Sequence, residues 1–163
     1  MRSTENNEGK RALAVAMGML ARRDMSSAEV ARRLTVKGFP AMLAGDVVSR
    51  LQAAGYLDDR RFAQRWAESS IRNGRGFGPR LRFELARLRV PDAIADEVLA
   101  SISAEYDEIE TLSAILAKKF PNFAPPSATD REKNRIIHYL QRRGFSTAAI
   151  FQAFRNKQLK SEG

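Results

Sequence analysis

Apolar residues recur at helical spacing along most of this 163-residue chain. Between residues 10 and 23, for example, Leu13, Met17 and Leu20 stand three or four positions apart, so they share one face of a helix. Similar stripes continue toward the C-terminus, and no stretch shows the sustained alternation of apolar and polar residues that is typical of a strand. The pattern therefore predicts an all-α protein.

Capping residues and helix breakers divide these stripes into short helices. Ser26 and Thr129 each precede a glutamate by three positions, which is the pattern of a helix N-terminal capping box. Gly38, Gly55 and Gly144 stand where a stripe ends, and glycine adopts the left-handed conformation of a helix C-terminus at little cost. This punctuation predicts nine principal helices.

The helices form three copies of one unit. Shifts of 51 and then 55 residues superpose the second and third helices of the copies without gaps. The superposed apolar positions are Val30, Leu81 and Ile136; Leu34, Leu85 and Leu140; Phe39, Val90 and Phe145; and Val48, Leu99 and Phe154. Such a period predicts three tandem three-helix repeats that resemble helix-turn-helix units, and chance similarity among amphipathic helices is the alternative.

The repeat boundaries follow from the same punctuation. We expect a flexible, polar N-terminus over residues 1–9, followed by repeats over residues 10–55, 56–104 and 105–163. Each repeat is too small to bury a large core alone, so neighbouring repeats should contribute to one another's cores.

Positive charge is concentrated in the centre of the chain. The net charge is +9, and residues 60–90 supply +7 of it through nine arginines opposed only by Glu68 and Glu84. Such a cluster indicates a surface for a polyanion or an acidic groove, and a solvated helix face is the alternative. On these physical grounds the candidate contact residues are Arg72, Arg75, Arg80, Arg82 and Arg87. Phe83 lies off the apolar stripe, so it is either exposed beside the arginines or packed against a neighbouring repeat.

Few residues suggest catalysis. The chain has no cysteine, and His138 is its one histidine, so a metal-binding cluster and a histidine acid–base pair are both disfavoured. The glycines at 74–78 (GRGFG) lack the spacing of a nucleotide-binding loop. We predict no enzyme, no cofactor and no metal. The acidic residues between Asp92 and Glu110 fit a solvated face better than a metal or partner surface, and Trp66 is assigned to the core.

Location and assembly are predicted from absences in the sequence. No apolar signal segment or membrane-spanning run is present, so we expect a cytoplasmic protein without a membrane partner. No heptad pattern suggests dimerisation, so we expect a monomer.

The central repeat resembles the signature of the RecX family, whose members regulate the bacterial recombinase RecA. The matching residues are 55–59 (GYLDD), 61–63 (RFA), Arg72, 78–79 (GP), Leu81 and 84–85 (EL). Weaker matches lie at 20–23 (LARR), 37–39 (KGF) and 142–146 (RRGFS). One departure is Arg89, where the family usually has a glycine. By this resemblance Asp58, Phe62, Gly78, Pro79, Leu81, Glu84 and Leu85 belong to the scaffold.

The resemblance implies an elongated, curved, positively charged molecule. It implies that the protein lies in the groove of the RecA filament on single-stranded or double-stranded DNA and suppresses ATP hydrolysis and strand exchange during recombination and repair. The favoured hypothesis is a non-enzymatic inhibitor of this kind. The alternative is a direct, sequence-specific helix-turn-helix regulator, which would bind paired half-sites as a dimer.

Overall fold

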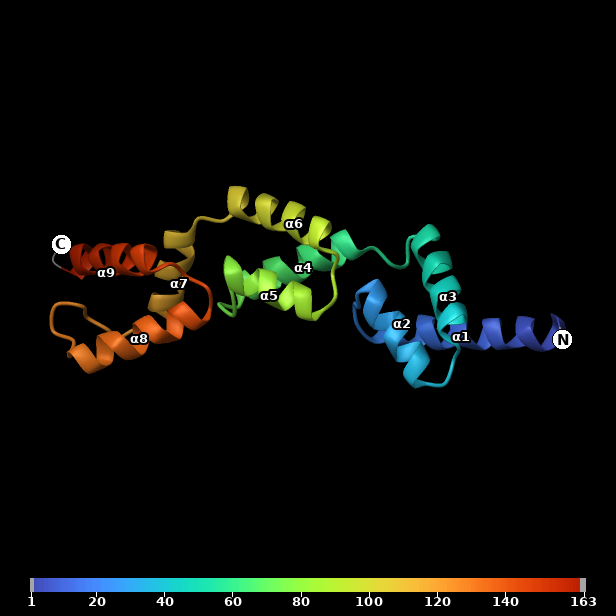
Figure 1. The fold of residues 1–163 in the computed structure, drawn as a ribbon. Coiled ribbons are helices and arrows are strands. Elements are labelled where there is room, and N and C mark those ends of the chain that lie inside the picture. The colour runs from blue at the N-terminus through green and yellow to red at the C-terminus, as the bar shows by residue number, and fades with distance from the viewer. Residues whose placement is uncertain (1, 162–163) are drawn as a thin grey trace. The chain divides into compact units, whose positions relative to one another are not determined.

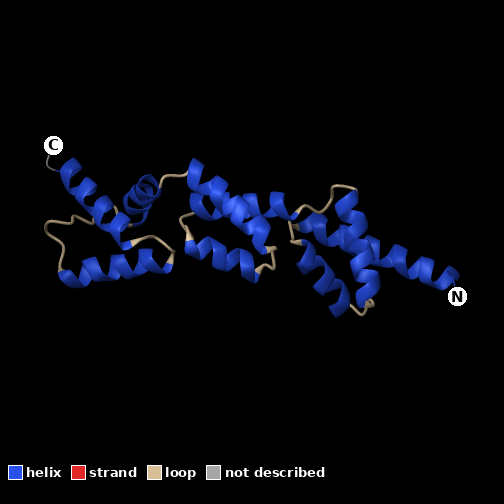
Figure 2. Cartoon of the chain, turned by 45° about the horizontal axis from the view of Figure 1, so that its top comes forward, coloured by secondary structure: helices blue, strands red, loops and turns tan. Residues whose placement is uncertain are grey.

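A computed structural model of the protein describes residues 2–161, and this range folds into nine α-helices without a strand (Figures 1 and 2). The helices are α1 (Arg2–Arg22), α2 (Ser27–Val36), α3 (Ala41–Ala53), α4 (Asp59–Arg72), α5 (Pro79–Arg87), α6 (Asp92–Glu105), α7 (Glu108–Lys119), α8 (Asp130–Arg142) and α9 (Thr147–Ser161). The all-α prediction is confirmed. Helix α1 begins at Arg2, which is earlier than the predicted start near Lys10.

The predicted capping residues set the helix boundaries. The side chains of Ser26 and Thr129 each accept a hydrogen bond at 3.2 Å, from the backbone N–H groups of Glu29 and Glu132 respectively. Asp58 Oδ1 accepts one at 2.9 Å from the N–H of Arg61 and thereby caps α4. These bonds satisfy backbone donors that the first turn of a helix leaves without a partner.

Most of the equivalent apolar positions of the three repeats are buried. Val30, Leu81 and Ile136 are at most 1% exposed, and Leu34, Leu85 and Leu140 are fully buried. This burial is the periodic core that the repeat predicts, and it confirms the three-helix pattern. Three assignments were too deep: the side chains of Phe39, Leu99 and Trp66 are half-buried rather than in the core. All three therefore retain some exposure to solvent.

The helices pack into two compact units. The N-terminal unit comprises the chain up to Gln64 together with Leu85–Ala95, and the C-terminal unit comprises Arg65–Glu84 together with the chain from Asp96 onward. The division passes through α4, α5 and α6, so the central repeat contributes packing surface to both units. The exact limits of the three repeats stay a prediction, as does the elongated, curved shape.

In the N-terminal unit, α1, α2 and α3 enclose one apolar core (Figure 1). The Ser26 hydroxyl caps α2 and also donates a hydrogen bond to the backbone oxygen of Leu88 at 2.6 Å. The backbone N–H of Ser27 donates to Asp59 Oδ1 at 2.7 Å. The start of α4 and the end of α5 are thus attached to the first repeat by polar contacts.

In the C-terminal unit, α7, α8 and α9 enclose a second core (Figure 1). The loop between α4 and α5 packs against the turn between α8 and α9. The backbone N–H of Phe77 donates to the oxygen of Arg143 at 2.8 Å, and the rings of Phe77 and Phe145 stack with centroids 5.3 Å apart. This loop is therefore held by the third repeat.

Candidate nucleic-acid interface

The loop between α4 and α5 carries the centre of the basic segment. Gly74 and Gly78 have φ angles of 63° and 47°, which lie in the left-handed region that disfavours other residues. The Asn73 side chain donates a hydrogen bond to the backbone oxygen of Ser69 at 2.7 Å and so closes the end of α4. Arg75 is exposed, and its guanidinium donates to the Ser69 hydroxyl at 3.2 Å. The two glycines therefore allow the backbone to turn, and the loop exposes Arg75 to solvent.

The five predicted contact residues are distributed over this loop and its flanking helices. Arg72 ends α4, Arg75 lies in the loop, and Arg80, Arg82 and Arg87 lie on α5. The C-terminal unit holds the first four, and Arg87 belongs to the N-terminal unit. Arg80 is half-buried and the other four are exposed. Arg80 and Arg82 stand two positions apart on a helix, so they point to different sides of it.

Two of the five arginines are paired with carboxylates. Arg80 lies 2.5 Å from Glu84, one helical turn away, and Arg82 pairs with Asp96 of α6. The two arginine side chains are 40% and 49% exposed, so solvent screens both pairs and each contributes only about 0–1 kcal/mol to stability. A phosphate could replace either carboxylate at little cost.

Phe83 is the exposed aromatic residue that the sequence suggested. Its side chain is 53% exposed, and the guanidinium carbon of Arg80 lies 5.4 Å from its ring centroid. This distance is within the range of a cation–π interaction. This exposure favours the first account of Phe83, exposure beside the arginines, over packing against a neighbouring repeat.

The sequence did not reveal a basic cleft of 440 Å³ in the C-terminal unit. The cleft is lined by Ile71, Arg72, Asn73, Gly74, Tyr106, Thr111, Ala114, Ile115, Lys118, Lys119 and Tyr139. Arg72 was among the predicted contact residues, but Lys118 and Lys119 were not. Their only signal was a pair of lysines in the last turn of a helix, which is also how a helix dipole is ordinarily neutralised.

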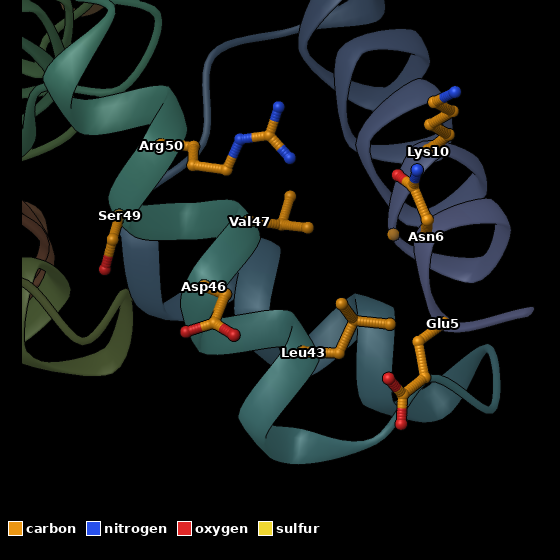
Figure 3. A pocket seen from close by; sticks show the side chains of 9 residues that line it. Glu5, Asn6, Lys10, Leu43, Asp46, Val47, Ser49 and Arg50 are labelled. Atoms are coloured by element: carbon orange, nitrogen blue, oxygen red, sulfur yellow. The ribbon is translucent and has the colours of Figure 1, made fainter. Parts of the chain in front are cut away.

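A second groove, of 580 Å³, lies between α1 and α3 in the N-terminal unit (Figure 3). Leu43 and Val47 of α3 point toward α1, which carries Asn6 and Lys10. Its charged lining residues are Lys10, Arg50, Glu5 and Asp46, whose charges balance. This groove therefore lacks the net charge that an anionic ligand requires.

Other candidate chemistry is not assembled in the described part of the chain. No group of three or more histidine, cysteine or acidic residues within residues 2–161 is placed to hold a metal ion. His138 lies exposed on α8. Within the same range, no helix has both the length and the apolar character of a membrane span.

Residues 2–161 thus form a helical repeat protein whose candidate site is a set of basic side chains, which is typical of a binding protein. Three family models match in the expected order: "RecX, first three-helix domain" at residues 12–51, "RecX, second three-helix domain" at 58–99 and "RecX, third three-helix domain" at 105–154. The chain belongs to the RecX family, a family of regulatory proteins rather than enzymes.

Relatives from several bacteria match over most of their length. "Regulatory protein RecX" of Trichlorobacter lovleyi is 35% identical over 151 residues, which cover 93% of this chain and 98% of that protein. The protein of the same name from Syntrophotalea carbinolica is 34% identical over 139 residues, or 85% of this chain and 91% of that one. The Thermus thermophilus protein of the same name is 32% identical, and the match covers 95% of this chain and 98% of that protein.

Solved structures confirm the fold. The crystal structure of RecX from Lactobacillus salivarius matches with a TM-score of 0.75 at 16% identity, covering 94% of this chain and 99% of that one. A second crystal structure, of a regulatory protein RecX, matches with a TM-score of 0.77 at 14% identity. This match covers 94% of this chain and 75% of that one. The fold is therefore retained where the sequences have largely diverged.

Proposed function

We propose that this protein is a cytoplasmic inhibitor of RecA that binds the RecA–DNA filament and slows its ATP hydrolysis and strand exchange in recombination and repair. The observation that supports this function most strongly is the charge of residues 60–90, which hold +7 of the net +9 in a chain of the RecX family. A protein that modulates a nucleoprotein filament has to approach DNA phosphates, and a concentrated positive field favours that approach.

Inhibition requires more than attraction to DNA. A ligand shifts a filament between states only as far as it binds one state better than the other, and a tenfold difference in affinity corresponds to about 1.4 kcal/mol. Arginine suits this role because its guanidinium binds phosphates and carboxylates in a fixed geometry. The exposed Arg72 and Arg75, together with the exchangeable pairs of Arg80 and Arg82, supply such groups.

The tandem repeats favour a filament as the partner. A filament offers the same binding surface at regular intervals, and a chain with several binding units can occupy more than one interval. Once one repeat has docked, the others bind at high effective concentration, so weak contacts sum to a useful affinity. This mode of binding requires only a monomer.

The test is the rate of ATP hydrolysis by RecA on single-stranded DNA as the protein is added. The wild type should slow hydrolysis, and the R75A/R80A/R82A variant should need several-fold more protein for the same effect. The matched control is R131A/R135A/R142A, which removes the same charge from three exposed arginines of α8. The control should inhibit as the wild type does.

A different result would favour the sequence-specific DNA-binding regulator. In that case a several-fold excess of wild-type protein leaves the ATPase rate unchanged, while the protein binds one particular duplex tightly. Such a regulator would also form a dimer on paired half-sites, which sedimentation of the complex would detect.

A further inference from the structure

The basic cleft in the C-terminal unit has the size of a small-ligand site. Its 440 Å³ falls within the range of about 300–1,000 Å³ that ligand pockets occupy. Ile71 and Ile115 give it an apolar wall, and Arg72, Lys118 and Lys119 give it three cations. None of its lining residues in the described part of the chain is acidic.

The three cations carry more positive charge than the two nearby helix C-termini neutralise. Arg72 lies in the last turn of α4, and Lys118 and Lys119 lie in the last turn of α7. The C-terminus of a helix carries about −0.5 of an elementary charge, so the two ends offset only about one of the three cations. The cleft therefore keeps a net positive charge and favours an anion.

Two tyrosines add aromatic surface to the cleft. Tyr106 and Tyr139 are both half-buried and both line it. The guanidinium carbon of Arg143 stacks 3.5 Å from the ring centroid of Tyr139, and Arg143 also donates hydrogen bonds to the backbone oxygens of Gly74 and Tyr139. Phe120 packs edge-on against the same ring, with centroids 5.2 Å apart. Lys119 Nζ lies 6.0 Å from the same centroid. Because these neighbours already hold Tyr139, a ligand that contacts the ring surface left open by Arg143 loses little entropy in ordering the ring.

We propose that this cleft binds one unstacked nucleotide of a single-stranded nucleic acid. The tyrosine rings contact the base, and Arg72, Lys118 and Lys119 contact its phosphates. Stacking on aromatic side chains beside a basic groove is the general way in which proteins hold single strands without sequence preference. Bases inside a duplex are already stacked, so their faces are not available to the tyrosines. An acidic peptide would use the cations but would leave the two rings without a role.

Nuclear magnetic resonance of the full-length protein with labelled tyrosine rings locates the site. The chain has three tyrosines, and Tyr56 lies in the N-terminal unit, where it is 57% exposed. On addition of an eight-residue oligodeoxythymidylate, the ring signals of Tyr106 and Tyr139 should shift, whereas those of Tyr56 should not. Shifts confined to Tyr56, or no shifts at all at saturating oligonucleotide, would overturn the proposal.

Fluorescence anisotropy with the same oligonucleotide tests the stacking. Y106L should bind roughly 5- to 150-fold more weakly, as expected for the loss of one base–aromatic stack, and Y106F, which keeps the ring, should bind as the wild type does. An oligonucleotide with abasic residues should bind the wild type at least as weakly as Y106L binds the intact strand, because it loses the contacts of both tyrosines. Equal binding of the abasic and intact strands would overturn the base-stacking claim.

The charge is tested with matched lysine pairs. K118Q/K119Q should weaken binding and reduce the salt slope by up to about 1.4, since each phosphate contact on a single strand contributes about 0.7. K157Q/K160Q removes the same charge from two lysines of α9 that do not line the cleft, and it should change neither the affinity nor the salt slope. Equal effects of the two pairs would show that only the overall charge matters.

Three further probes identify the ligand class. A duplex of the same length and thymidine monophosphate should both bind more weakly than the single strand, and polyglutamate should leave the tyrosine signals unchanged. Equal affinity for the monophosphate would assign the cleft to free nucleotides, and tyrosine shifts with polyglutamate would assign it to acidic peptides.

These measurements omit RecA, and Arg75, Arg80 and Arg82 do not line the cleft. Failure here is therefore distinct from failure of the proposed inhibition.

Discussion

At the scale of single residues, Arg89 stands at a position where the other two repeats have a glycine. Its φ of 58° is the one positive value among the described non-glycine residues. The repeat alignment places Arg89 at the same position as Gly38 and Gly144, whose φ angles are 96° and 90°. The N–H groups of all three donate to the backbone oxygen three residues earlier, at 2.9–3.0 Å. The helix end is therefore retained, and an L-residue adopts the conformation that suits glycine.

Replacing Arg89 with glycine should stabilise the protein. The left-handed conformation costs an L-residue about 1–2 kcal/mol, while glycine loses about 0.4–1 kcal/mol of stability through the entropy of the unfolded chain. The expected net gain for R89G is about 0.5–1 kcal/mol, measured as a higher midpoint of thermal unfolding. R89A, which removes the same charge but stays an L-residue, should show no such gain. A lower midpoint for R89G than for R89A would contradict this account.

At the scale of elements, the helices could be predicted because the residues that determine where a helix forms and ends are close together in the sequence. The spacing of Leu34, Leu85 and Leu140 and the capping by Ser26 and Thr129 depend only on near neighbours. The early start of α1 was missed because residues 2–9 are polar and carry no apolar stripe.

The candidate site could be predicted only in part. A charge census identifies the arginines as a group, but the pairing of Arg82 with Asp96 joins two helices and has no signature in a linear sequence. The cleft combines residues from Ile71 to Tyr139, so it exists only once α4, α7 and α8 have packed. Tyr106 and Tyr139 could not be assigned to a common site for the same reason.

The close approach of two turns in the C-terminal unit gives a sharp test of element packing. A Cβ atom at Gly144 would lie 2.1 Å from the backbone oxygen of Phe77 and 2.8 Å from the backbone N of Arg80. A Cβ atom at Gly38, which has a similar φ, would meet nothing within 4 Å. G38A should therefore lose only about 1–2 kcal/mol for its conformation, whereas G144A should lose that amount plus roughly 1–3 kcal/mol for the clash.

Chemical denaturation of the two glycine variants measures the difference. The expected outcome is a larger loss of unfolding free energy for G144A than for G38A, with the same helical content in both folded proteins. Equal losses would mean that the loop between α4 and α5 does not pack against the turn between α8 and α9.

At the scale of the whole molecule, charge and packing are divided differently along the chain. Residues 60–90 hold +7 of the net +9, whereas residues 91–163 are neutral overall. The same central segment contributes to both compact units. Variants that remove three arginines from the central segment or three from α8 therefore carry the same total charge but distribute it differently. This makes it possible to separate a specific basic surface from general attraction to a polyanion.

The most direct test of that distinction is equilibrium binding to RecA filaments on single-stranded DNA across a range of salt concentrations. We predict that R75A/R80A/R82A binds more weakly than the wild type and has a salt slope shallower by up to about 2, since each lost phosphate contact contributes about 0.7. R131A/R135A/R142A should match the wild type in both affinity and slope. Equal losses of affinity and slope in the two variants would contradict the claim that the central arginines form the binding surface.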